Sequence, residues 1–466
     1  MPASRAAALY AARALLPQGW CNDVVLHWDA AGLLTEVACG QDPAGWARAP
    51  GPVIPGMPNL HSHAFQRAMA GLTETRTDPH DSFWSWRTLM YRFAARLQPQ
   101  QLEAIARHLY IEMLQAGYTS VCEFHYVHHA SSGLPYANPA EHAERLIAAA
   151  ADAGIGLTLL PVLYQYSGFG AQPPLPQQAR FIHTPESLLA LLQDLRRRHP
   201  PHGALRYGAA PHSLRAVSPH SLEQLRVGLH HDDPGAPLHL HIAEQHAEVE
   251  ACLAALGARP VQWLLDHQPV DARWCVVHAT HMTPAEYAAL AGSGAVAGLC
   301  PTTEANLGDG VFDAQRYLDA GGAWGIGSDS QASVCARAEL RLLEYGQRLL
   351  QRSRNVLAAA HGEAHAAVAD RLYPQAVSGG ARAAGRPIDG LRVGQRADFL
   401  VLDPDHPDLA ERAASQLLSG LVFCEHGASP IRDVYTGGQQ VVSERVHRSQ
   451  DTALHAYRAA LRELLS

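Results

Sequence analysis

The segment VIPGMPNLHSH, residues 53–63, decides the fold class because it joins an apolar run to two histidines one residue apart. The pattern predicts a buried strand over Val53–Leu60 that ends at His61 and His63. Alternate residues of a strand point to the same side, so the two imidazoles face one way. Paired imidazoles at the end of a strand are candidate metal ligands.

Short apolar runs of the same kind recur along the chain, each followed by a helical pattern. Alternation of this kind predicts parallel strands joined by helical crossovers. Eight strands favour an α/β fold, a closed (β/α)₈ TIM-like barrel. The other predicted strands are Ser120–Phe124, Gly156–Leu163, Leu205–Ala210, Leu238–Ile242, Trp274–Val277, Ala295–Leu299 and Ala323–Ile326. The predicted helices include Gln101–Ala116, Pro139–Ala153, Pro185–Arg198, Ser218–His230, Ala247–His267 and Pro284–Ala291.

The two ends of the chain predict a second, smaller β unit. Asp23–Ala38 and Ala397–Leu402 have strand patterns, and Val434–Val442 reads as a hairpin around Gly437 and Gly438. We therefore predict a small β-sandwich domain built from residues 1–52 plus 388–450. The barrel then spans residues 53–387, and residues 451–466 form a C-terminal helix.

Composition narrows the class of protein. The chain has 466 residues, 47% of them hydrophobic, and a formal net charge of −8, which argues against nucleic acid as a partner. No apolar run is long enough to span a membrane. The eight cysteines form no CxxC pair, which is typical of free thiols in a reducing cytoplasm. Lysine is absent, so chemistry that needs a lysine side chain is excluded.

Further polar residues follow the predicted strands where the strands end. His241 closes the fifth strand, His278 follows the sixth, and Asp329 follows the eighth. The carboxyl ends of barrel strands share one rim, where barrel enzymes keep their active sites. Three imidazoles and one carboxylate suit a borderline-soft ion. We predict one Zn²⁺ per chain, held by His61, His63, His241 and Asp329.

The remaining histidines and two cysteines receive structural interpretations. His239 and His281 are predicted to be structural, and Cys122 and Cys300 to be core thiols. We expect His125, His128 and His129 to lie in a loop that faces solvent. The histidines predicted to be solvated are His230, His231, His361 and His365.

With these residues in hand, the chain resembles the amidohydrolase superfamily along nearly its whole length. Within that superfamily it is similar to the branch that hydrolyses N-formimino-L-glutamate. HSHAFQR, HIAEQ and GSDSQ together form a specific set, whereas HxH alone indicates only the superfamily. The matching segments are Pro55–Glu74, Trp84–Arg87, Glu123–Tyr126, Ala210–Val217, Leu240–Gln245, Val276–His281, Cys300–Gly310 and Gly327–Gln331.

The resemblance implies a reaction and roles for named residues. N-formimino-L-glutamate and water would give N-formyl-L-glutamate and ammonia, in histidine degradation. Asp329 would accept a proton from water, Glu244 would protonate the imine or departing nitrogen, and His278 would orient the nucleophile. The substrate is a small dicarboxylate, and guanidinium forks suit carboxylates. The residues implied in substrate binding are Gln66, Arg87, Tyr126, His212 and Arg215. A homodimer is also implied.

The absence of lysine bears on the number of metal ions. Binuclear members of the superfamily use a bridging carbamylated lysine, so a mononuclear site is expected here. Other deaminases of the superfamily remain alternatives: one acting on formimino-aspartate, a guanidino acid, or a purine such as guanine. An inactive metal-binding scaffold is also an alternative, although no ligand or acid/base residue is missing.

Overall fold

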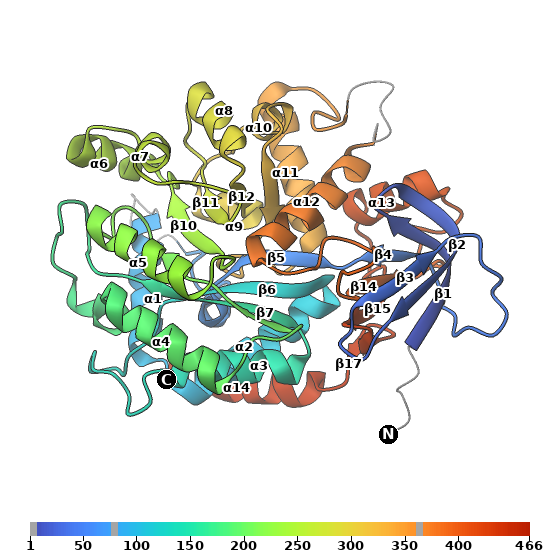
Figure 1. Ribbon diagram of the computed structural model, residues 1–466, viewed down its shortest axis with the longest axis horizontal. Coiled ribbons are helices and arrows are strands. Elements are labelled where there is room, and N and C mark those ends of the chain that lie inside the picture. Colours follow the sequence, from blue (N-terminus) through green and yellow to red (C-terminus); the bar gives the residue numbers. More distant parts are fainter. Residues whose placement is uncertain (1–6, 76–82, 360–366) are drawn as a thin grey trace.

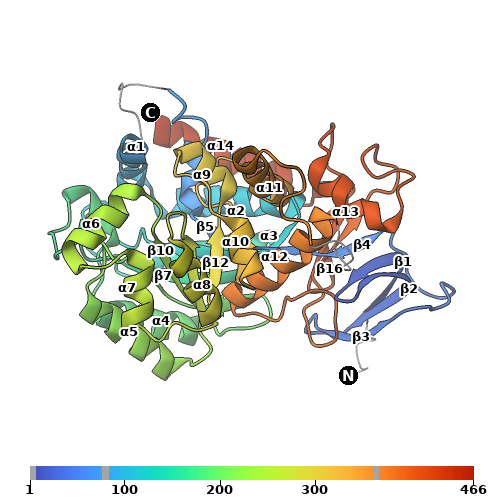
Figure 2. The same cartoon turned by 90° about the horizontal axis from the view of Figure 1, so that it is seen from above.

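The computed structural model describes residues 7–75, 83–359 and 367–466. A large body of strands and helices adjoins a sheet built from the two ends of the chain (Figure 1). The view from above shows the same two parts side by side (Figure 2). The N-terminal strands β1 (Ala7–Leu16), β2 (Gly19–Trp28) and β3 (Leu34–Ala38) lie at the outer edge. All the residues singled out for chemistry belong to the large body.

The large body contains two parallel sheets. One has the order β5-β6-β7-β8, with β9 also paired to β7, and the other has the order β10-β11-β12-β13. Their strands are β5 (Met57–Ser62), β6 (Tyr118–His125), β7 (Gly156–Leu163), β8 (Leu205–Tyr207), β9 (Ala210–Pro211), β10 (Leu238–Ile242), β11 (Trp274–His278), β12 (Val296–Leu299) and β13 (Ala323–Ile326). The predicted strands in the large body are present within a few residues of their expected bounds, with two exceptions. Val53–Leu60 is divided at Gly56 into β4 (Val53–Pro55) of the terminal sheet and β5, and Leu205–Ala210 is divided into β8 and β9.

Isolated parallel bridges join the two sheets at both edges. Ser62, the last residue of β5, pairs with Asp329 after β13, and Ala209 pairs with Leu238 at the other seam. Every residue of β6 and β7 is buried, as expected of parallel strands covered on both faces. The carboxyl ends of all these strands consequently lie at one end of the body.

Helices follow most of the strands and begin at conventional start signals. Thr184, Ser218 and Thr283 accept hydrogen bonds from the backbone at the starts of α4, α5 and α8, and each is followed by proline. The helices and 3₁₀ turns are η1 (Ala64–Met69), α1 (Phe83–Arg96), α2 (Pro99–Gln115), α3 (Glu141–Ala153), η2 (Pro176–Phe181), α4 (Pro185–Arg198), α5 (Pro219–Asp232), α6 (His246–Leu256), α7 (Pro260–His267), α8 (Pro284–Ser293), α9 (Pro301–Leu307), α10 (Ala314–Asp319), α11 (Ala336–Gln351), α12 (Val368–Ala384), α13 (Ala414–Phe423) and α14 (Gln450–Leu465).

One predicted helix is divided. The prediction of a single helix over Ala247–His267 is wrong, because α6 ends at Leu256 and α7 begins at Pro260. Gly257 has a φ of 73°, the left-handed conformation that ends helices. Proline then occupies the first position of the next helix, where its missing N–H is harmless.

Two glycines of α12 let this helix lie directly against the strands that carry the site. A Cβ at Gly379 would collide with the backbone carbonyl of Trp324 in β13. A Cβ at Gly380 would lie 2.8 Å from Pro58 Cβ in β5. The helix therefore supports both the strand of His61 and the strand that leads to Asp329.

The terminal strands form one sheet of eight, ordered β17-β16-β15-β14-β4-β1-β2-β3. The expectation of a sandwich is wrong in this respect, because β4 pairs with both β1 and β14 and so joins the two ends of the chain edge to edge. β1 was not anticipated in its alanine-rich segment. The strands are β1 (Ala7–Leu16), β2 (Gly19–Trp28), β3 (Leu34–Ala38), β4 (Val53–Pro55), β14 (Phe399–Leu402), β15 (Ile431–Thr436), β16 (Gln439–Ser443) and β17 (Val446–His447). The division of the chain into domains at residues 52 and 388 stays a prediction. β4, which begins at residue 53, is hydrogen-bonded to the terminal strands β1 and β14.

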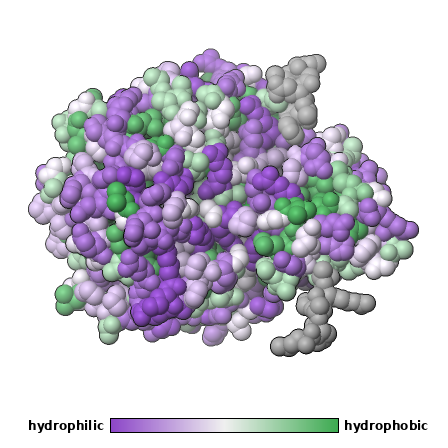
Figure 3. Space-filling view, in the orientation of Figure 1, coloured by the Kyte–Doolittle hydropathy of each residue, from purple (hydrophilic) through white to green (hydrophobic). Residues whose placement is uncertain are grey.

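The molecular surface is mostly hydrophilic over the helices, and apolar residues gather over the terminal sheet in this view (Figure 3). Within the described ranges, we find no helix that is long and apolar enough to cross a membrane. The eight cysteines are free thiols.

Candidate active site and metal centre

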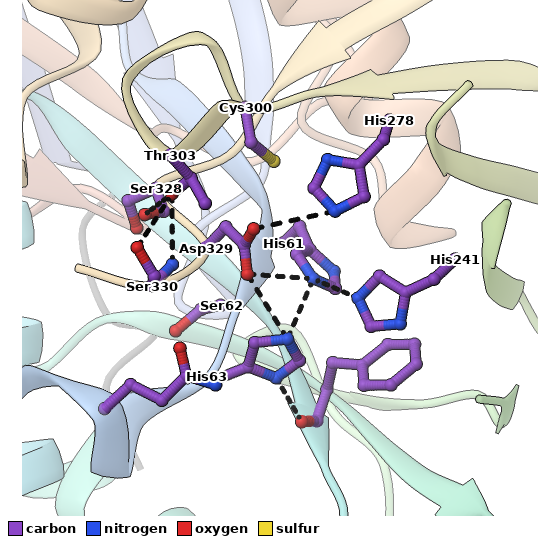
Figure 4. A network of polar contacts seen from close by, with 12 residues as sticks. His61, Ser62, His63, His241, His278, Cys300, Thr303, Ser328, Asp329 and Ser330 are labelled. Atoms are coloured by element: carbon purple, nitrogen blue, oxygen red, sulfur yellow. Dashed lines mark hydrogen bonds and ion pairs between the residues drawn. The ribbon is translucent and has the colours of Figure 1, made fainter. Parts of the chain in front are cut away.

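Four predicted metal ligands converge where β5, β10 and β13 end. His61 Nε2 lies 3.1 Å from His63 Nε2 and 2.9 Å from His241 Nε2. An oxygen of Asp329, Oδ1, lies 3.4 Å from His61 Nε2 and 3.3 Å from His63 Nε2. Figure 4 shows these rings turned toward the Asp329 carboxylate. The site thus gathers donors from three strands that are far apart in the sequence.

The hydrogen bonds of Nδ1 determine the protonation of Nε2 in two of the rings. His63 Nδ1 lies 2.9 Å from the carbonyl oxygen of Phe124, and His241 Nδ1 lies 3.1 Å from that of His212. A carbonyl only accepts, so each Nδ1 carries the proton and each Nε2 presents a lone pair. Facing lone pairs at about 3 Å repel each other unless a cation lies between them. The donor set therefore fits a divalent metal ion.

Burial keeps the inward-facing rings neutral. It lowers the pKa of His61 to about 3, and it lowers the pKa of His63 and of His241 as well. Burial alone would raise the pKa of Asp329, but the surrounding imidazoles, His61 first, outweigh burial and lower that pKa. Neutral imidazoles with an ionised carboxylate are the protonation states that metal ligation requires.

Backbone hydrogen bonds tie the HxH segment to the Asp329 loop. The His63 N–H donates to the Asp329 carbonyl at 3.2 Å, and the Asp329 N–H donates to the His61 carbonyl at 3.0 Å. Asp329 and His278 both have left-handed backbone, with φ of 44° and 69°. Such conformations in non-glycine residues cluster at functional sites, where surrounding contacts hold them in place.

Glu123 supports the HxH segment from β6. Its carboxylate accepts hydrogen bonds from Ser62 Oγ at 2.7 Å, from the Ala64 N–H at 2.6 Å and from Tyr110 Oη at 3.2 Å. Burial raises the pKa of Glu123 to about 7, and the three donors oppose that shift. Ser62 lies between the two histidines and Ala64 follows His63, so this carboxylate fixes the backbone on both sides of His63.

His278 lies beside the donor set, between two further carboxylates. Its Nε2 is 3.7 Å from Asp329 Oδ2 and 3.8 Å from Glu244 Oε1, while Nδ1 is 3.3 Å from Glu304 Oε1. Burial lowers the pKa of His278, but these three carboxylates outweigh burial and raise it to about 10. His278 also forms a compact group of possible ligands with Asp329 and Cys300, whose thiol is buried as predicted.

Glu244 lies in the turn between β10 and α6, where its carboxylate faces His278. Burial raises the pKa of Glu244 to about 7. The carboxylate of Glu248 accepts the backbone N–H groups of Ala243 and Glu244, at 3.1 and 3.0 Å, and holds the turn. A carboxyl group with a pKa near neutrality is suited to both giving and taking a proton.

The five residues implied in substrate binding line one cavity together with three of the four metal donors. Gln66 Nε2 donates to Tyr126 Oη at 2.9 Å, so two of the five support each other. Arg87 lies over the ring of Tyr91, and Arg215 Nη1 donates to Tyr164 Oη at 3.3 Å. The predicted site residues that line this cavity are His63, Gln66, Arg87, Tyr126, His212, Arg215, His241, Glu244, His278 and Asp329. His61 lies behind them and is fully buried.

Several residues of the site were not predicted. Glu304 and Glu248 hold catalytic candidates, and Tyr91 and Tyr164 line the cavity. Glu304 lies in the first turn of α9, which begins just after β12 ends, so its place after a strand could have identified it. Tyr91 lies in a helix and carries no such signal.

The expectation that His125, His128 and His129 face solvent is wrong. All three are buried, and they pack with His142 and His183 into a second histidine cluster. His128 and His129 each place Nε2 within hydrogen-bond distance of a backbone carbonyl. His239 likewise reaches the Ala383 carbonyl, which agrees with its structural interpretation. His230 and His231 are exposed as predicted, while His361 and His365 lie outside the described residues.

Comparisons with known proteins place the chain in a family. The model of the amidohydrolase family matches residues 53–441, and the chain belongs to that family. It is 52% identical to a formimidoylglutamate deiminase of Pseudomonas aeruginosa, over 98% of this chain and 99% of that protein. It is similar to the crystal structure of an amidohydrolase from Brucella melitensis, with 47% identity, a TM-score of 0.92, and coverage of 99% and 100%.

A more distant structure shares the fold. The adenosine deaminase of Xanthomonas campestris, solved with bound zinc, is 20% identical and has a TM-score of 0.79, with 100% of both chains covered. This likeness concerns the fold alone. The histidine and aspartate donors described above are this chain's own, and they fit a divalent ion.

Proposed function

We propose that this protein hydrolyses N-formimino-L-glutamate to N-formyl-L-glutamate and ammonia, with one zinc ion per chain. The observation that carries the proposal is one cavity lined by three of the candidate metal donors, by Glu244 and by two arginines. The 52% identity to a formimidoylglutamate deiminase along nearly both full lengths supports the same reaction. The dicarboxylate substrate matches Arg87 and Arg215, since guanidinium groups bind carboxylates with two parallel hydrogen bonds.

His61, His63, His241 and Asp329 are the residues that would hold the metal. A divalent ion bound there supplies Lewis acidity, which makes water nucleophilic near neutral pH. Zinc is favoured by the three imidazole donors. The absence of lysine from the chain agrees with a single ion, because no carbamylated lysine is available to bridge two.

Two residues transfer protons in the reaction, and a third stabilises charge. Asp329, ionised and next to the histidines, accepts a proton from the attacking water. Glu244, with its pKa raised to about 7, delivers a proton to the imine or to the departing nitrogen. His278, held protonated by the surrounding carboxylates, stabilises negative charge that develops at the reacting centre.

A deaminase for a flat ring such as guanine is the alternative. Two cationic side chains in the cavity lining favour an anionic substrate over a neutral base. A formimino-aspartate or guanidino-acid substrate would use the same charges and differ in length.

We also propose that the two parallel sheets close into one (β/α)₈ barrel, which the bridges at both seams support. Eight free thiols support a reducing, cytoplasmic location. A homodimer, with no nucleic-acid or membrane partner, completes the proposal. Light scattering of the purified protein would measure the oligomeric state.

The decisive experiment measures ammonia release by zinc-loaded protein. N-formimino-L-glutamate, N-formimino-L-aspartate and guanine are supplied in parallel, and Asp329→Ala is the inactive reference. We expect fast release from the glutamate compound alone. Release only from guanine would overturn the roles of Arg87 and Arg215, and no release from zinc-loaded protein would overturn the substrate class.

A further inference from the structure

A buried glutamine joins two tyrosines of the cavity wall. Gln178, in η2, is fully buried, and its Nε2 donates to Tyr91 Oη at 3.0 Å and to Tyr164 Oη at 2.8 Å. Its Oε1 accepts the Leu175 N–H at 2.7 Å. A backbone N–H only donates, so this bond determines which end of the amide faces the tyrosines.

The direction of these bonds determines where the tyrosine protons point. An amide nitrogen donates and does not accept, so both hydroxyl oxygens serve Gln178 as acceptors. Tyr164 Oη accepts a further bond from Arg215 Nη1 at 3.3 Å. Among the described residues we find no acceptor for the hydrogen of either hydroxyl, and both tyrosines line the cavity. Each therefore has an O–H available to a bound molecule.

Two guanidinium groups accompany the hydroxyls. Arg87 Cζ lies 5.6 Å from the centre of the Tyr91 ring, and Arg215 is held by Tyr164 Oη and by the Ser167 carbonyl at 3.2 Å. Burial raises the pKa of Tyr91 to about 12, so its hydroxyl keeps its proton at neutral pH. Together with the two hydroxyl donors, these cationic groups make this wall a candidate anion site.

The wall lies next to the metal donors. The ring of His212 is 4.6 Å from that of Tyr164 and 5.0 Å from that of His241. A substrate whose reacting carbon is held at the metal donors would thus extend past His212 to the tyrosines.

We propose that the hydroxyls of Tyr91 and Tyr164 donate hydrogen bonds to one carboxylate of the substrate, beside Arg215, and that Gln178 is the positioning residue that turns both hydroxyls toward it. The inference rests on the proposed function, since it assigns specificity determinants for that dicarboxylate. It explains why an uncharged glutamine is buried behind the wall: only a donor at that point leaves both phenol hydrogens for the substrate.

The test uses the zinc-loaded full-length enzyme and three variants. Tyr164→Phe and Tyr91→Phe each remove one donor. Gln178→Glu keeps the shape but replaces the amide donor with an acceptor, which draws both phenol hydrogens away from the cavity. We expect kcat/KM for N-formimino-L-glutamate to fall about ten- to a hundredfold in each, mainly through KM, because hydrogen bonds to charged groups are the stronger ones.

Two analogues identify the carboxylate. N-formimino-4-aminobutyrate lacks the α-carboxylate, and N-formimino-L-norvaline lacks the γ-carboxylate. For the analogue that lacks the contacted group, Tyr164→Phe should change kcat/KM by less than about threefold. If an analogue turns over too slowly, its inhibition constant against N-formimino-L-glutamate gives the same comparison.

The control is Tyr207→Phe, which removes a hydroxyl that donates to the His199 carbonyl outside the cavity, and it should leave kinetics unchanged. If Tyr164→Phe lowers kcat/KM equally for the dicarboxylate and both analogues, or does not lower it at all, the inference is overturned. Turnover by the wild type would still support the proposed function in that case. Absence of wild-type turnover would instead refute the proposed function itself.

Discussion

His278 Nδ1 lies 3.3 Å from Glu304 Oε1, and that same oxygen accepts the Cys300 N–H at 2.9 Å. The carboxylate is buried at the start of α9, directly behind the ring. It fixes the proton on Nδ1 and aims Nε2 at Glu244 and Asp329. Carboxylates that orient a histidine in this way tune its basicity and its direction.

Replacing Glu304 should therefore impair catalysis without loss of metal. We expect Glu304→Ala to lower kcat about ten- to a hundredfold with KM within about threefold, because His278 loses its partner. Glu304→Gln, whose carbonyl oxygen still accepts from Nδ1, should retain more activity than Glu304→Ala. Steady-state kinetics and zinc analysis check both. Equal kcat in Glu304→Gln and Glu304→Ala would contradict a role through the hydrogen bond.

Removing the ionisable group of Glu244 should affect the chemical step. Glu244→Gln preserves shape but cannot transfer a proton, so we expect kcat to fall by about 10²- to 10⁴-fold. Binding should persist, because Arg87 and Arg215 remain. The measurement is kcat and KM for N-formimino-L-glutamate at pH 7.

Glu250→Gln provides the matched control, because Glu250 is an exposed glutamate of α6 only six residues away. Its kinetics should equal those of the wild type. A loss in Glu244→Gln smaller than tenfold would show that another group moves the proton.

Much of the site followed from where polar residues stand relative to apolar runs. His61, His241, His278 and Asp329 each end or follow a buried strand, and parallel strands bring such positions together. β7, β10 and β13 begin and end where their apolar runs predicted. Those bounds follow from the runs of apolar residues, which can be read from the local sequence.

The residues that support the site had no comparable signal. Glu123 and Gln178 are polar side chains whose partners are distant in the chain, so only the tertiary fold shows that they are satisfied when buried. The buried cluster around His128 was missed for the same reason, since polarity favoured a solvated loop. β4 was joined to β5 in the prediction because Gly56, which separates two sheets, lies within one apolar run.

That buried cluster predicts acid sensitivity. Burial, followed by the charge of His129, lowers the pKa of His183 to about 3, whereas a histidine in an unfolded chain titrates near 6.5. Between these values the unfolded chain binds more protons, so stability is present above pH 6.5 and declines as pH falls toward 3. His183→Gln should reduce the slope of unfolding free energy against pH by about 1.4 kcal/mol per pH unit. Urea titrations at pH 7 and pH 5 measure it, and an unchanged slope would contradict the neutral, buried state.

Metal removal should cost both activity and stability, because the lone pairs of His61, His63 and His241 then face each other without a cation. A ligand that binds only the folded state stabilises it by about 2.7 kcal/mol at a hundredfold excess over its Kd. Chelation should therefore abolish ammonia release and lower the Tm, and one equivalent of Zn²⁺ should restore both. His241→Ala should lose zinc, while His231→Ala, at an exposed position of α5, should retain one ion per chain. A chelated protein with unchanged Tm and full activity would refute the metal centre, since repulsion among the imidazoles would then need no counter-charge.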